Sequence, residues 1–466
     1  MLRKIFKNAA VLASGTIGGQ IFVVAVSPLL TRLYTPEQFG FFGAYVAVLY
    51  LILSFAALRY EIAIPLLKDE DDANCLIVAS IAIVALVSIA TLVLFSVVAT
   101  VYPLQKWAEV WWALPLGVFL AGAYNVLVHA CLRAKRHVEI AKTRVLQSVG
   151  SALFQLISGI FSGSVIGLLV GQIIGVSSGI GRLVKFIDWK DCGKKIKFSR
   201  VVRILKEQKA FAKYDAPAAL IFVANAHAPT LLIAILFSPM AAGIYALVQR
   251  VLVTPLSLIS NALSTSLISH GREASIVDDE AYARNISNSS LLITPIATGA
   301  ALGAYFLFEP IFGSQWRLAG EVAAWMALFV GQKFIFDSLF YLLAMRGRQR
   351  KGFFIQLFLA ITRLVALLIV ANGCEFLPAI AIFSFFSAIA YLIAIFLVVK
   401  IEGPRVYIKV AFGFVDLIFP YLVVFAFIFS FLSMKNAFAI FSLYGMWAGF
   451  RVIPVLAPFF KKAKWQ

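Results

Sequence analysis

Long apolar stretches separated by short polar ones run along the whole chain. Runs of roughly 18–25 apolar residues are long enough to cross a ~30 Å hydrocarbon core as helices. We place about fourteen such spans at 8–31, 40–59, 74–100, 113–132, 145–163, 165–187, 216–237, 244–268, 288–308, 321–344, 353–371, 377–399, 411–433 and 437–459. Because the runs are continuous rather than alternating, they favour helices over membrane strands. The pattern predicts an all-α polytopic membrane protein.

Composition supports lipid as the solvent for most of the surface. Of the 466 residues, 62% are hydrophobic and 14% are charged, with a mean hydropathy of +0.94. A soluble domain of this length could not bury so much apolar surface. The four cysteines are widely scattered and form no CxxC pair, so neither a disulfide frame nor a metal site nor a resident cofactor is expected.

Charge indicates the orientation of the spans. The formal charge is +19, from 41 Lys and Arg and 22 Asp and Glu residues. If the N-terminus is cytoplasmic, most basic residues fall in segments on the cytoplasmic side, which is the usual bias of membrane proteins. Both termini are then cytoplasmic. The most basic segment, 182–213, is predicted to face anionic lipid headgroups, and no nucleic-acid partner is expected.

One turn sequence occurs twice. Residues 34–40 read YTPEQFG and residues 237–243 read FSPMAAG, so both place an aromatic residue, Ser or Thr, Pro and then Gly at matching positions. The first turn joins predicted spans one and two, and the second joins spans seven and eight. Basic exits also follow spans four and ten, at 132–136 and 345–350. The repeat predicts two parallel six-helix bundles, a transporter plan in which rocking alternates access.

The predicted organisation has four parts. They are a six-helix bundle at 1–187, a basic cytoplasmic linker at 188–215, a second six-helix bundle at 216–399, and two additional transmembrane helices with a basic tail at 400–466. All predicted outer loops are short, so no domain is expected outside the membrane on that side.

Several segments of the first bundle resemble a known family. They are LASGTIGGQ at 12–20, SPLLTRLYTPEQFGFFGAY at 27–45, RYEIAIPLLKDEDDA at 59–73 and LRAKRHVEIAKTRVLQS at 132–148. The chain resembles the polysaccharide transporters, or O-antigen-type oligosaccharide flippases, of the multidrug/oligosaccharidyl-lipid/polysaccharide exporter superfamily. Many O-antigen members have twelve helices, whereas the fourteen spans placed here are similar in number to those of lipid II flippases.

The resemblance implies a substrate, a place and partners. Its members carry undecaprenyl-pyrophosphate-linked oligosaccharide repeat units, for O-antigen or a related surface polysaccharide, from the cytoplasmic to the outer leaflet of the bacterial cytoplasmic (inner) membrane. It also implies a cationic central cavity and alternating access. A polysaccharide polymerase and a chain-length regulator are the protein partners it suggests, in addition to membrane lipid.

Cations within spans are the candidate substrate ligands. A charge at the bilayer centre costs roughly 2.5–3.5 kcal/mol on insertion scales and usually faces a cavity or a partner. Arginine binds phosphate oxygens through paired hydrogen bonds, and a pyrophosphate needs two or three cationic donors. The cations predicted to bind the pyrophosphate are Arg250, Lys333 and Arg363 within spans and Arg32 at the outer end of the first span.

Three further charged residues are candidates for coupling or gating. Asp337 follows Lys333 by four residues and so shares its helix face, either as a self-neutralising ion pair or as a group that tunes the cations or carries a coupling ion. Arg59 and Glu61 close the second span on the cytoplasmic side, as a gate or as a local helix-end salt bridge. The coupling ion, H⁺ or Na⁺, stays open.

Polar uncharged residues and histidines within spans are candidate glycan contacts. They are Gln20, Asn225, His227 and Gln249. Such side chains suit sugar hydroxyls, but each also serves as a hydrogen-bonding contact between helices.

Three classes of function can be weighed. A flippase for an anionic lipid-linked glycan fits the excess of cations over carboxylates within the spans. An ion-coupled multidrug exporter of the same superfamily is the alternative, although export of cations favours buried carboxylates. A membrane enzyme is not expected, because the predicted outer loops are short and Glu109 and Glu309 are isolated rather than part of an acidic cluster. No nucleophile triad, phosphate-cradling loop or metal-ligand cluster occurs in the sequence, so ATP hydrolysis is not expected either.

Overall fold

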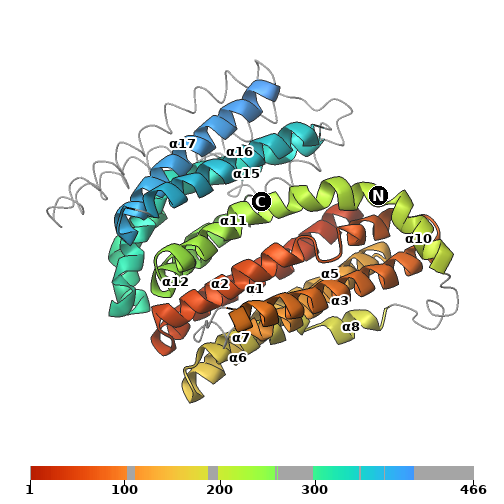
Figure 1. Cartoon of the computed structure of the whole chain (residues 1–466), viewed down its shortest axis with the longest axis horizontal. Helices are drawn as coiled ribbons and strands as arrows, with labels where there is room; N and C mark the ends of the chain where they lie inside the picture. The colour runs from red at the N-terminus through yellow and green to blue at the C-terminus, as the bar shows by residue number, and fades with distance from the viewer. Residues whose placement is uncertain are drawn as a thin grey trace, which may run out of the picture. The chain divides into compact units, whose positions relative to one another are not determined.

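The structure is a computed structural model that describes residues 2–101, 111–186, 198–257, 260, 298–345, 348–371 and 373–402. Every regular element in these ranges is a helix, and the predicted all-α class is confirmed (Figure 1). The predicted spans 411–433 and 437–459 lie outside the described residues.

The chain forms two compact units, unit 1 at Met1–Ala246 and unit 2 at Leu247–Gln466. Unit 1 contains α1 (Leu2–Leu33), α2 (Pro36–Leu53), η1 (Tyr60–Leu66), α3 (Glu70–Val101), α5 (Ala113–Arg133), α6 (His137–Phe161), α7 (Val165–Ser177), α8 (Ile180–Val184), α10 (Phe198–Glu207), η2 (Phe211–Asp215) and α11 (Ala216–Leu236). Helix α12 (Pro239–Val248) runs across the boundary between the units. Unit 2 contains η3 (Gln249–Val253), a helix at Thr298–Phe312, η4 (Ser314–Trp316), α15 (Arg317–Met345), α16 (Gln349–Ala371) and α17 (Phe376–Glu402).

The predicted linker at 188–215 ends before α11, whereas the boundary between the compact units falls within α12. Helix α11 packs against α2 of unit 1. The predicted limits of the two six-helix bundles stay a prediction.

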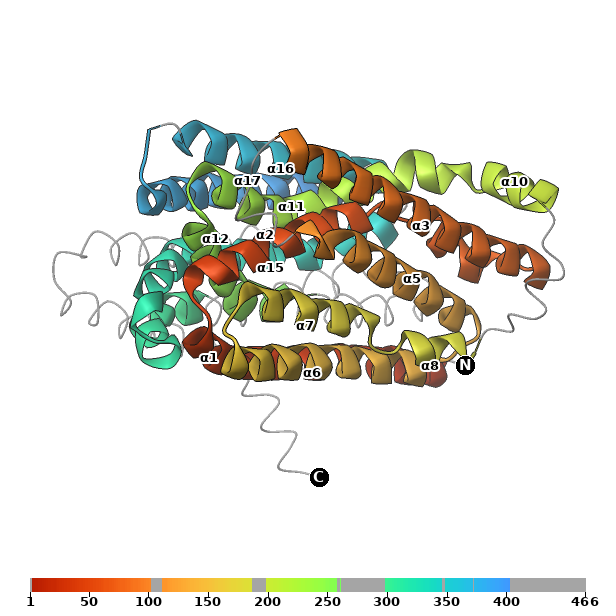
Figure 2. The ribbon, with the colours of Figure 1, turned by 60° about the horizontal axis from the view of Figure 1, so that its bottom comes forward.

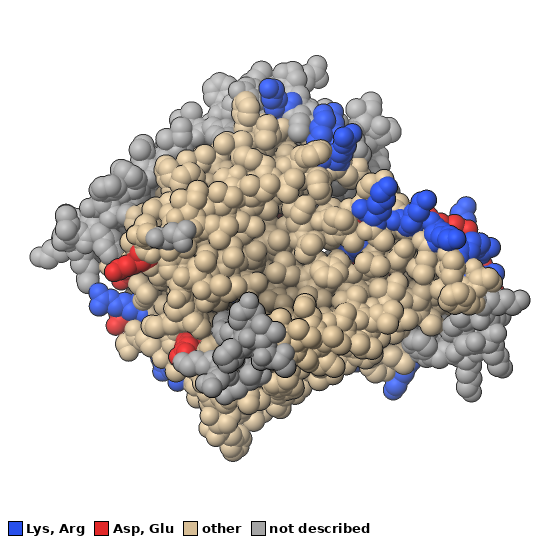
Figure 3. Space-filling view, viewed as in Figure 1, with Lys and Arg blue, Asp and Glu red and all other residues tan. Residues whose placement is uncertain are grey.

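Ten helices in the described part of the chain are long and apolar enough to cross a membrane. They lie at Ser14–Leu33, Pro36–Leu53, Glu70–Val98, Ala113–Arg133, Val165–Val184, Phe211–Leu236, Pro239–Ser257, Ser314–Phe340, Gln349–Ala371 and Phe376–Val398. Apolar side chains also cover their outer faces: on α3, Leu86 and Leu94 are 66% and 59% exposed. Figure 3 shows a broad face of uncharged residues, with Lys and Arg gathered beside α10. The chain is a multi-pass membrane protein, in which helices satisfy the backbone hydrogen bonds that lipid cannot.

Two predicted spans are interrupted. The span predicted at 40–59 ends as a helix at Leu53, and Leu58 and Arg59 then adopt left-handed backbone conformations with φ of 49° and 63°. The span predicted at 165–187 breaks between α7 and α8, where Gly179 has φ of 96°. Left-handed conformations cannot continue a right-handed helix, so hydropathy alone placed the end of the 40–59 span too late, whereas Val165–Val184 remains long enough to cross a membrane despite its break.

The repeated turn starts a helix in both places. Thr35 and Gln38 form a capping box at the start of α2, with the Gln38 amide donating to Thr35 Oγ1 (3.3 Å) and the Thr35 amide donating to Gln38 Oε1 (2.9 Å). At α12 the amide of Ala241 donates to Ser238 Oγ (3.1 Å). Proline at the first helical position suits both starts, because its missing N–H would have no helical partner there.

The glycines of the two turns explain why the turn occurs twice. A Cβ atom on Gly40 would overlap the carbonyl oxygen of Pro239, and a Cβ atom on Gly243 would overlap the carbonyl oxygen of Pro36. The first turns of α2 and α12 therefore pack backbone to backbone in a reciprocal contact, next to the packed pair α2 and α11 (Figure 2). Only glycine leaves room for this approach.

We predict that Gly40→Ala lowers the stability of the folded protein. The added methyl group meets a backbone oxygen that cannot rotate away, and overpacking of this kind costs about 1–3 kcal/mol. Thermal unfolding of the detergent-solubilised protein measures the loss. Gly18→Ala on α1 is the matched control, because a Cβ there meets nothing within 4 Å and alanine favours a helix. Equal melting temperatures for the two variants would contradict the reciprocal contact.

Candidate functional site

An ion pair lies within α15 of unit 2. Lys333 Nζ is 2.5 Å from Asp337 Oδ2, and their side chains are 21% and 18% exposed. The spacing of four residues places both on one helix face, as the sequence predicted. The predicted ion pair is therefore present, and both of its side chains are partly buried.

Arg363 of α16 is enclosed by neighbouring helices of unit 2. Only 3% of this residue is exposed. Its Nε donates to Ser387 Oγ (3.1 Å) and its Nη1 donates to the Tyr391 hydroxyl (3.4 Å). Its guanidinium carbon also lies 5.5, 5.2 and 5.5 Å from the ring centres of Phe329, Phe383 and Tyr391. These cation–π contacts and hydroxyl groups stabilise the buried charge.

These residues form one group, the charged cluster of unit 2, defined as Lys333, Asp337 and Arg363. Arg363 lies over the ring of Phe329, which is one helical turn before Lys333 on α15, so the two cations are neighbours. Two cations and one carboxylate leave a net positive charge, so the ion pair does not neutralise the cluster. Such a cluster attracts an anion and still allows release, because Asp337 compensates part of the charge.

Gln249 and Arg250 lie in η3, a single π-helical turn. Both residues are half-buried, and Thr254 Oγ1 donates to the carbonyl of Gln249 (3.1 Å). π-Helical turns inside α-helices are frequent at functional sites because they redirect side chains. Of the residues predicted to bind substrate, Gln249, Arg250, Lys333 and Arg363 lie in unit 2.

The remaining predicted binding residues lie in unit 1. The His227 ring of α11 stacks on Tyr50 of α2, with ring centres 5.0 Å apart and planes 13° apart. Asn225 is buried on α11, and Gln20 is half-buried on α1. Arg32 is exposed in the last turn of α1. Their assignment to pyrophosphate or glycan stays a prediction.

Arg59 joins two carboxylates at the end of unit 1 that holds η1 and η2. Its Nε is 2.8 Å from Asp215 Oδ2, and its Nη1 is 3.7 Å from Glu61 Oε1. Asp215 ends the π-helical turn η2, directly before α11, and lies 156 residues from Arg59 in sequence. The Arg59 contacts therefore reach beyond the local helix end, to the start of another membrane helix. The sequence did not single out Asp215.

Glu61 is the most buried member of this group. Its side chain is 8% exposed, and its Oε2 has no hydrogen-bond partner among the described residues. Burial raises the pKa of the Glu61 carboxyl above its ordinary value of 4.5, Arg59 and His129 act against this rise, and Asp215 adds to it. One guanidinium is thus shared by two carboxylates, and protonation of Glu61 would balance the charge.

A second ionic contact holds α10 against α3. Arg200 lies within 3.4, 3.0 and 3.1 Å of Asp69, Asp71 and Asp72, and Arg203 lies 3.0 Å from Asp72. The acidic run therefore both starts helix α3 and holds part of the basic segment 182–213. Those two arginines are neutralised within unit 1.

One cation inside unit 1 was missed by the sequence analysis. Arg144 was placed just before a span predicted to begin at 145, but α6 begins at His137. The basic and acidic residues of its first turns lower the hydropathy there, so a count of apolar runs does not detect the start of the helix.

Within the described residues no group of three His, Cys, Asp or Glu side chains could hold a metal ion.

Comparisons with known proteins agree with this architecture. The family model described as "Polysaccharide biosynthesis protein" matches residues 29–320. The lipid II flippase MurJ in an inward closed conformation is similar, with a TM-score of 0.71 and 10% identity over 97% of this chain and 99% of that chain. No match is found among curated protein sequences.

Two multidrug transporter structures are similar as well. An inward-facing MATE family transporter of the MOP superfamily has a TM-score of 0.58 at 10% identity, over 84% of this chain and 95% of that chain. A mutant of the Vibrio cholerae MATE transporter VcmN has a TM-score of 0.53 at 14% identity, over 87% and 98%. At such identities the likeness concerns the fold, which is shared with these transporters and with the flippase.

We predict that Glu61→Gln changes how stability depends on pH. Because the pKa of Glu61 is raised on folding, its contribution to stability is fully present below pH 4.5 and is lost as the pH rises through the folded pKa. From pH 4.5 towards about 7, the melting temperature of wild type should therefore fall relative to that of the variant.

Glu139→Gln is the control of opposite sign. Lys142 and Arg182 hydrogen-bond Glu139 and lower the pKa of its carboxyl, so its contribution is present above the ordinary pKa and is lost on acidification. Parallel melting curves for wild type and Glu61→Gln across this pH range would show that Glu61 does not titrate in the folded protein.

Proposed function

Because the chain belongs to the polysaccharide biosynthesis protein family, we propose that it is a flippase for undecaprenyl-pyrophosphate-linked oligosaccharide repeat units of O-antigen or a related surface polysaccharide. The observation that carries the proposal is the net positive cluster of Lys333, Asp337 and Arg363 inside unit 2. A pyrophosphate needs cationic donors, whereas a cationic drug would need buried carboxylates in excess. The fold shared with a lipid II flippase also supports it.

The cluster suggests how the headgroup is held. Lys333 supplies a mobile ammonium donor, while Arg363 is fixed by its rings and hydroxyls and supplies a constant positive field. The pyrophosphate would displace Asp337 and take its place as the partner of the Lys333 ammonium. This exchange keeps binding weak enough for release on the other side, where the glycan leaves and Asp337 restores the pair.

The transport cycle that we propose is alternating access. The pyrophosphate and its glycan enter from the cytoplasmic leaflet while the polyprenyl tail stays in lipid. Arg32 and Arg250 would guide the pyrophosphate, and Gln20, Asn225, His227 and Gln249 would contact sugar hydroxyls. Arg59, Glu61 and Asp215 would act as a cytoplasmic gate, because their ion pairs tie η1 to the start of α11.

We place the chain in the bacterial cytoplasmic membrane, with both termini in the cytoplasm. The distribution of basic residues along the sequence supports this orientation. A polysaccharide polymerase and a chain-length regulator would act on the product in the outer leaflet. The cycle would be driven by H⁺ or Na⁺.

We predict that Lys333→Ala lowers transport in liposomes that contain the purified protein and a labelled undecaprenyl-pyrophosphate oligosaccharide. Loss of one hydrogen bond to a charged group costs about 1.5–3 kcal/mol, so transport at limiting substrate should fall roughly tenfold to a hundredfold. A membrane-impermeant probe follows the label from one leaflet to the other. Lys351→Ala, which removes an exposed lysine near the start of α16, is the control and should transport as wild type does.

Two results would contradict the proposal. Equal transport by wild type and Lys333→Ala would remove Lys333 from the site. Failure of wild type to move the glycan, together with export of a cationic dye, would favour the multidrug exporter instead.

We predict that Asp337→Asn binds the pyrophosphate more tightly and releases it more slowly. The substitution removes the only carboxylate of the cluster, so the anion no longer competes for Lys333. The measurement is the maximal rate of leaflet crossing together with the substrate concentration at half-maximal rate, and both should fall. A change in melting temperature with unchanged transport would show that the pair only stabilises α15.

A further inference from the structure

Arg133 binds the backbone of the connection between η1 and α3. It lies in the last turn of α5, and its Nη1 donates to the carbonyl oxygens of Ile64 (3.4 Å) and Leu67. Its Nη2 donates to the carbonyl oxygens of Lys68 (3.3 Å) and Asp69 (3.2 Å). Leu67 is the cap residue at the end of η1, where carbonyl oxygens lack helical partners and a cationic side chain can serve instead. One guanidinium therefore caps η1 and holds the chain that leads into α3.

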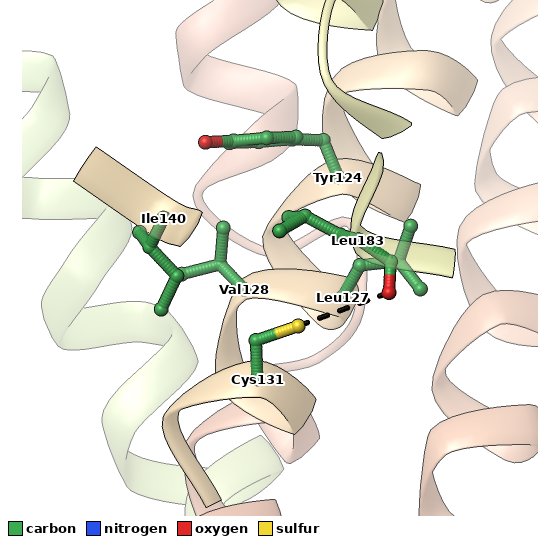
Figure 4. Packing of buried hydrophobic residues seen from close by; sticks show 6 residues of the cluster. All are labelled: Tyr124, Leu127, Val128, Cys131, Ile140 and Leu183. Carbon is green, nitrogen blue, oxygen red and sulfur yellow. Dashed lines mark hydrogen bonds between the residues drawn. The ribbon is translucent and has the colours of Figure 1, made fainter. Parts of the chain in front are cut away.

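The end of α5 that carries Arg133 is fixed by a packed core. Leu127 and Cys131 of α5 pack with Ile140 of α6 and Leu183 of α8 (Figure 4). The Cys131 thiol also donates to the Leu183 carbonyl (3.9 Å). Arg133 follows Cys131 by two positions, which is about 200° around the helix, so it leaves α5 from the opposite face. The Arg133 guanidinium therefore extends from a fixed support.

The segment that Arg133 holds carries the gate residues. Arg59 precedes η1 in a left-handed conformation, and Glu61 lies in the first turn of η1 with its side chain 8% exposed. The chain between Leu53 and η1 forms turns rather than a regular helix. A continuous helix therefore does not set the place of η1, which depends on its contacts with neighbouring elements. It packs against α5 and α3, and the four hydrogen bonds from Arg133 join all three.

The ionic contact between η1 and η2 differs in kind from this backbone contact. Arg59 Nε is 2.8 Å from Asp215 Oδ2, and the Asp215 side chain is 45% exposed. An ion pair with this exposure is screened by salt and depends on the charge of its carboxylate. Carbonyl oxygens do not titrate. The contact of η1 with α5 is therefore the one that persists when the ion pair with η2 breaks.

We propose that Arg133 is a positioning residue of the cytoplasmic gate, which holds η1 on the end of α5 so that Glu61 stays buried beside Arg59. Arg133 acts through the backbone of residues 64–69 and does not bind substrate. The word gate rests on the proposed function, whereas the docking of η1 by Arg133 stands on the geometry of unit 1.

The first test measures amide hydrogen exchange of the full-length protein in detergent. In Arg133→Gln, amides of residues 60–69 should exchange roughly tenfold to a hundredfold faster than in wild type, because hydrogen bonds from a charged donor are lost. Peptides from the middle of α3 and α5 should keep their wild-type rates, which shows that the variant is folded. Wild-type protection of residues 60–69 in Arg133→Gln would overturn the docking role.

Arg133→Lys separates the arginine fork from its charge. Lysine keeps the positive charge at the end of α5 but lacks two separate nitrogens that can reach different carbonyl oxygens. Protection of residues 60–69 should therefore lie between that of wild type and that of Arg133→Gln. Full protection in Arg133→Lys would assign the effect to charge alone and overturn the capping geometry.

The second test asks whether Arg133 sets the titration of Glu61, which a purely structural role elsewhere would not do. Burial raises the pKa of the Glu61 carboxyl, and the ionisable groups that face it are Arg59, Asp215 of η2 and His129 of α5. In the Arg133→Gln background, Glu61 becomes hydrated and its pKa returns towards 4.5.

The readout is the difference in melting temperature between proteins with Glu61 and with Gln at this position, followed from pH 4.5 to about 7. With Arg133 present, this difference should change with pH. In the Arg133→Gln background, that change should be lost. The carboxylates at the start of α3, which also packs against η1, are bound by Arg200 and remain so in every variant. An equal change with pH in both backgrounds would overturn the positioning role.

Lys135→Gln is the matched control. It removes one positive charge two residues after Arg133, where the side chain is exposed. Hydrogen exchange of residues 60–69 and the titration of Glu61 should both match wild type. Equal effects of Lys135→Gln and Arg133→Gln would show a general effect of charge and overturn the specific role of Arg133.

The third test separates the positioning role from the proposed function. In the liposome assay, the maximal rate of wild type should change between about pH 5 and 7, and Glu61→Gln and Arg133→Gln should both lose this dependence. If wild type moves the glycan with a pH dependence that Arg133→Gln retains, Arg133 does not position the gate and the function stands. If wild type moves no glycan but Arg133→Gln still abolishes the titration of Glu61, the function fails and the positioning role stands.

Discussion

Charges inside a membrane protein must be compensated, because lipid cannot solvate them. The chain meets this constraint in different ways within each unit. Lys333 is paired with Asp337, and Arg363 is surrounded by three aromatic rings and two hydroxyls. Arg59 is shared by Glu61 and Asp215. Since each solution takes its groups from particular helices, the same contacts that hold the charges also fix how those helices pack.

Close backbone packing is the second requirement of the fold. Pro36 and Pro239 start their helices, Thr35 and Ser238 cap them, and the glycine four residues after each proline lets the other turn approach. A motif that looks like a local turn is therefore also a long-range contact. Helix α12 begins at this contact and continues across the boundary into unit 2. The residues that start and cap α12 are therefore next to the glycine that packs against α2.

Long apolar helices were the most predictable elements, and their ends were the least. The span predicted at 113–132 corresponds closely to α5, at Ala113–Arg133. The end of α2 was placed too late because Leu58 and Arg59 leave the helical conformation within an apolar run. The start of α6 was placed too late because its first turns are polar, and Arg144 was missed for that reason. Helix ends depend on caps and neighbours, which hydropathy does not report.

The sequence by itself determined the all-α membrane class, the repeated turn and the spacing that pairs Lys333 with Asp337. These follow from chain-local physics, because a helix in lipid satisfies its own backbone and places residues four apart on one face. Only the tertiary structure decided that Arg59 meets Asp215, that Arg363 lies among aromatic rings, and that the two turns touch each other. Such contacts join residues far apart in the chain, and their geometry comes from how whole helices pack.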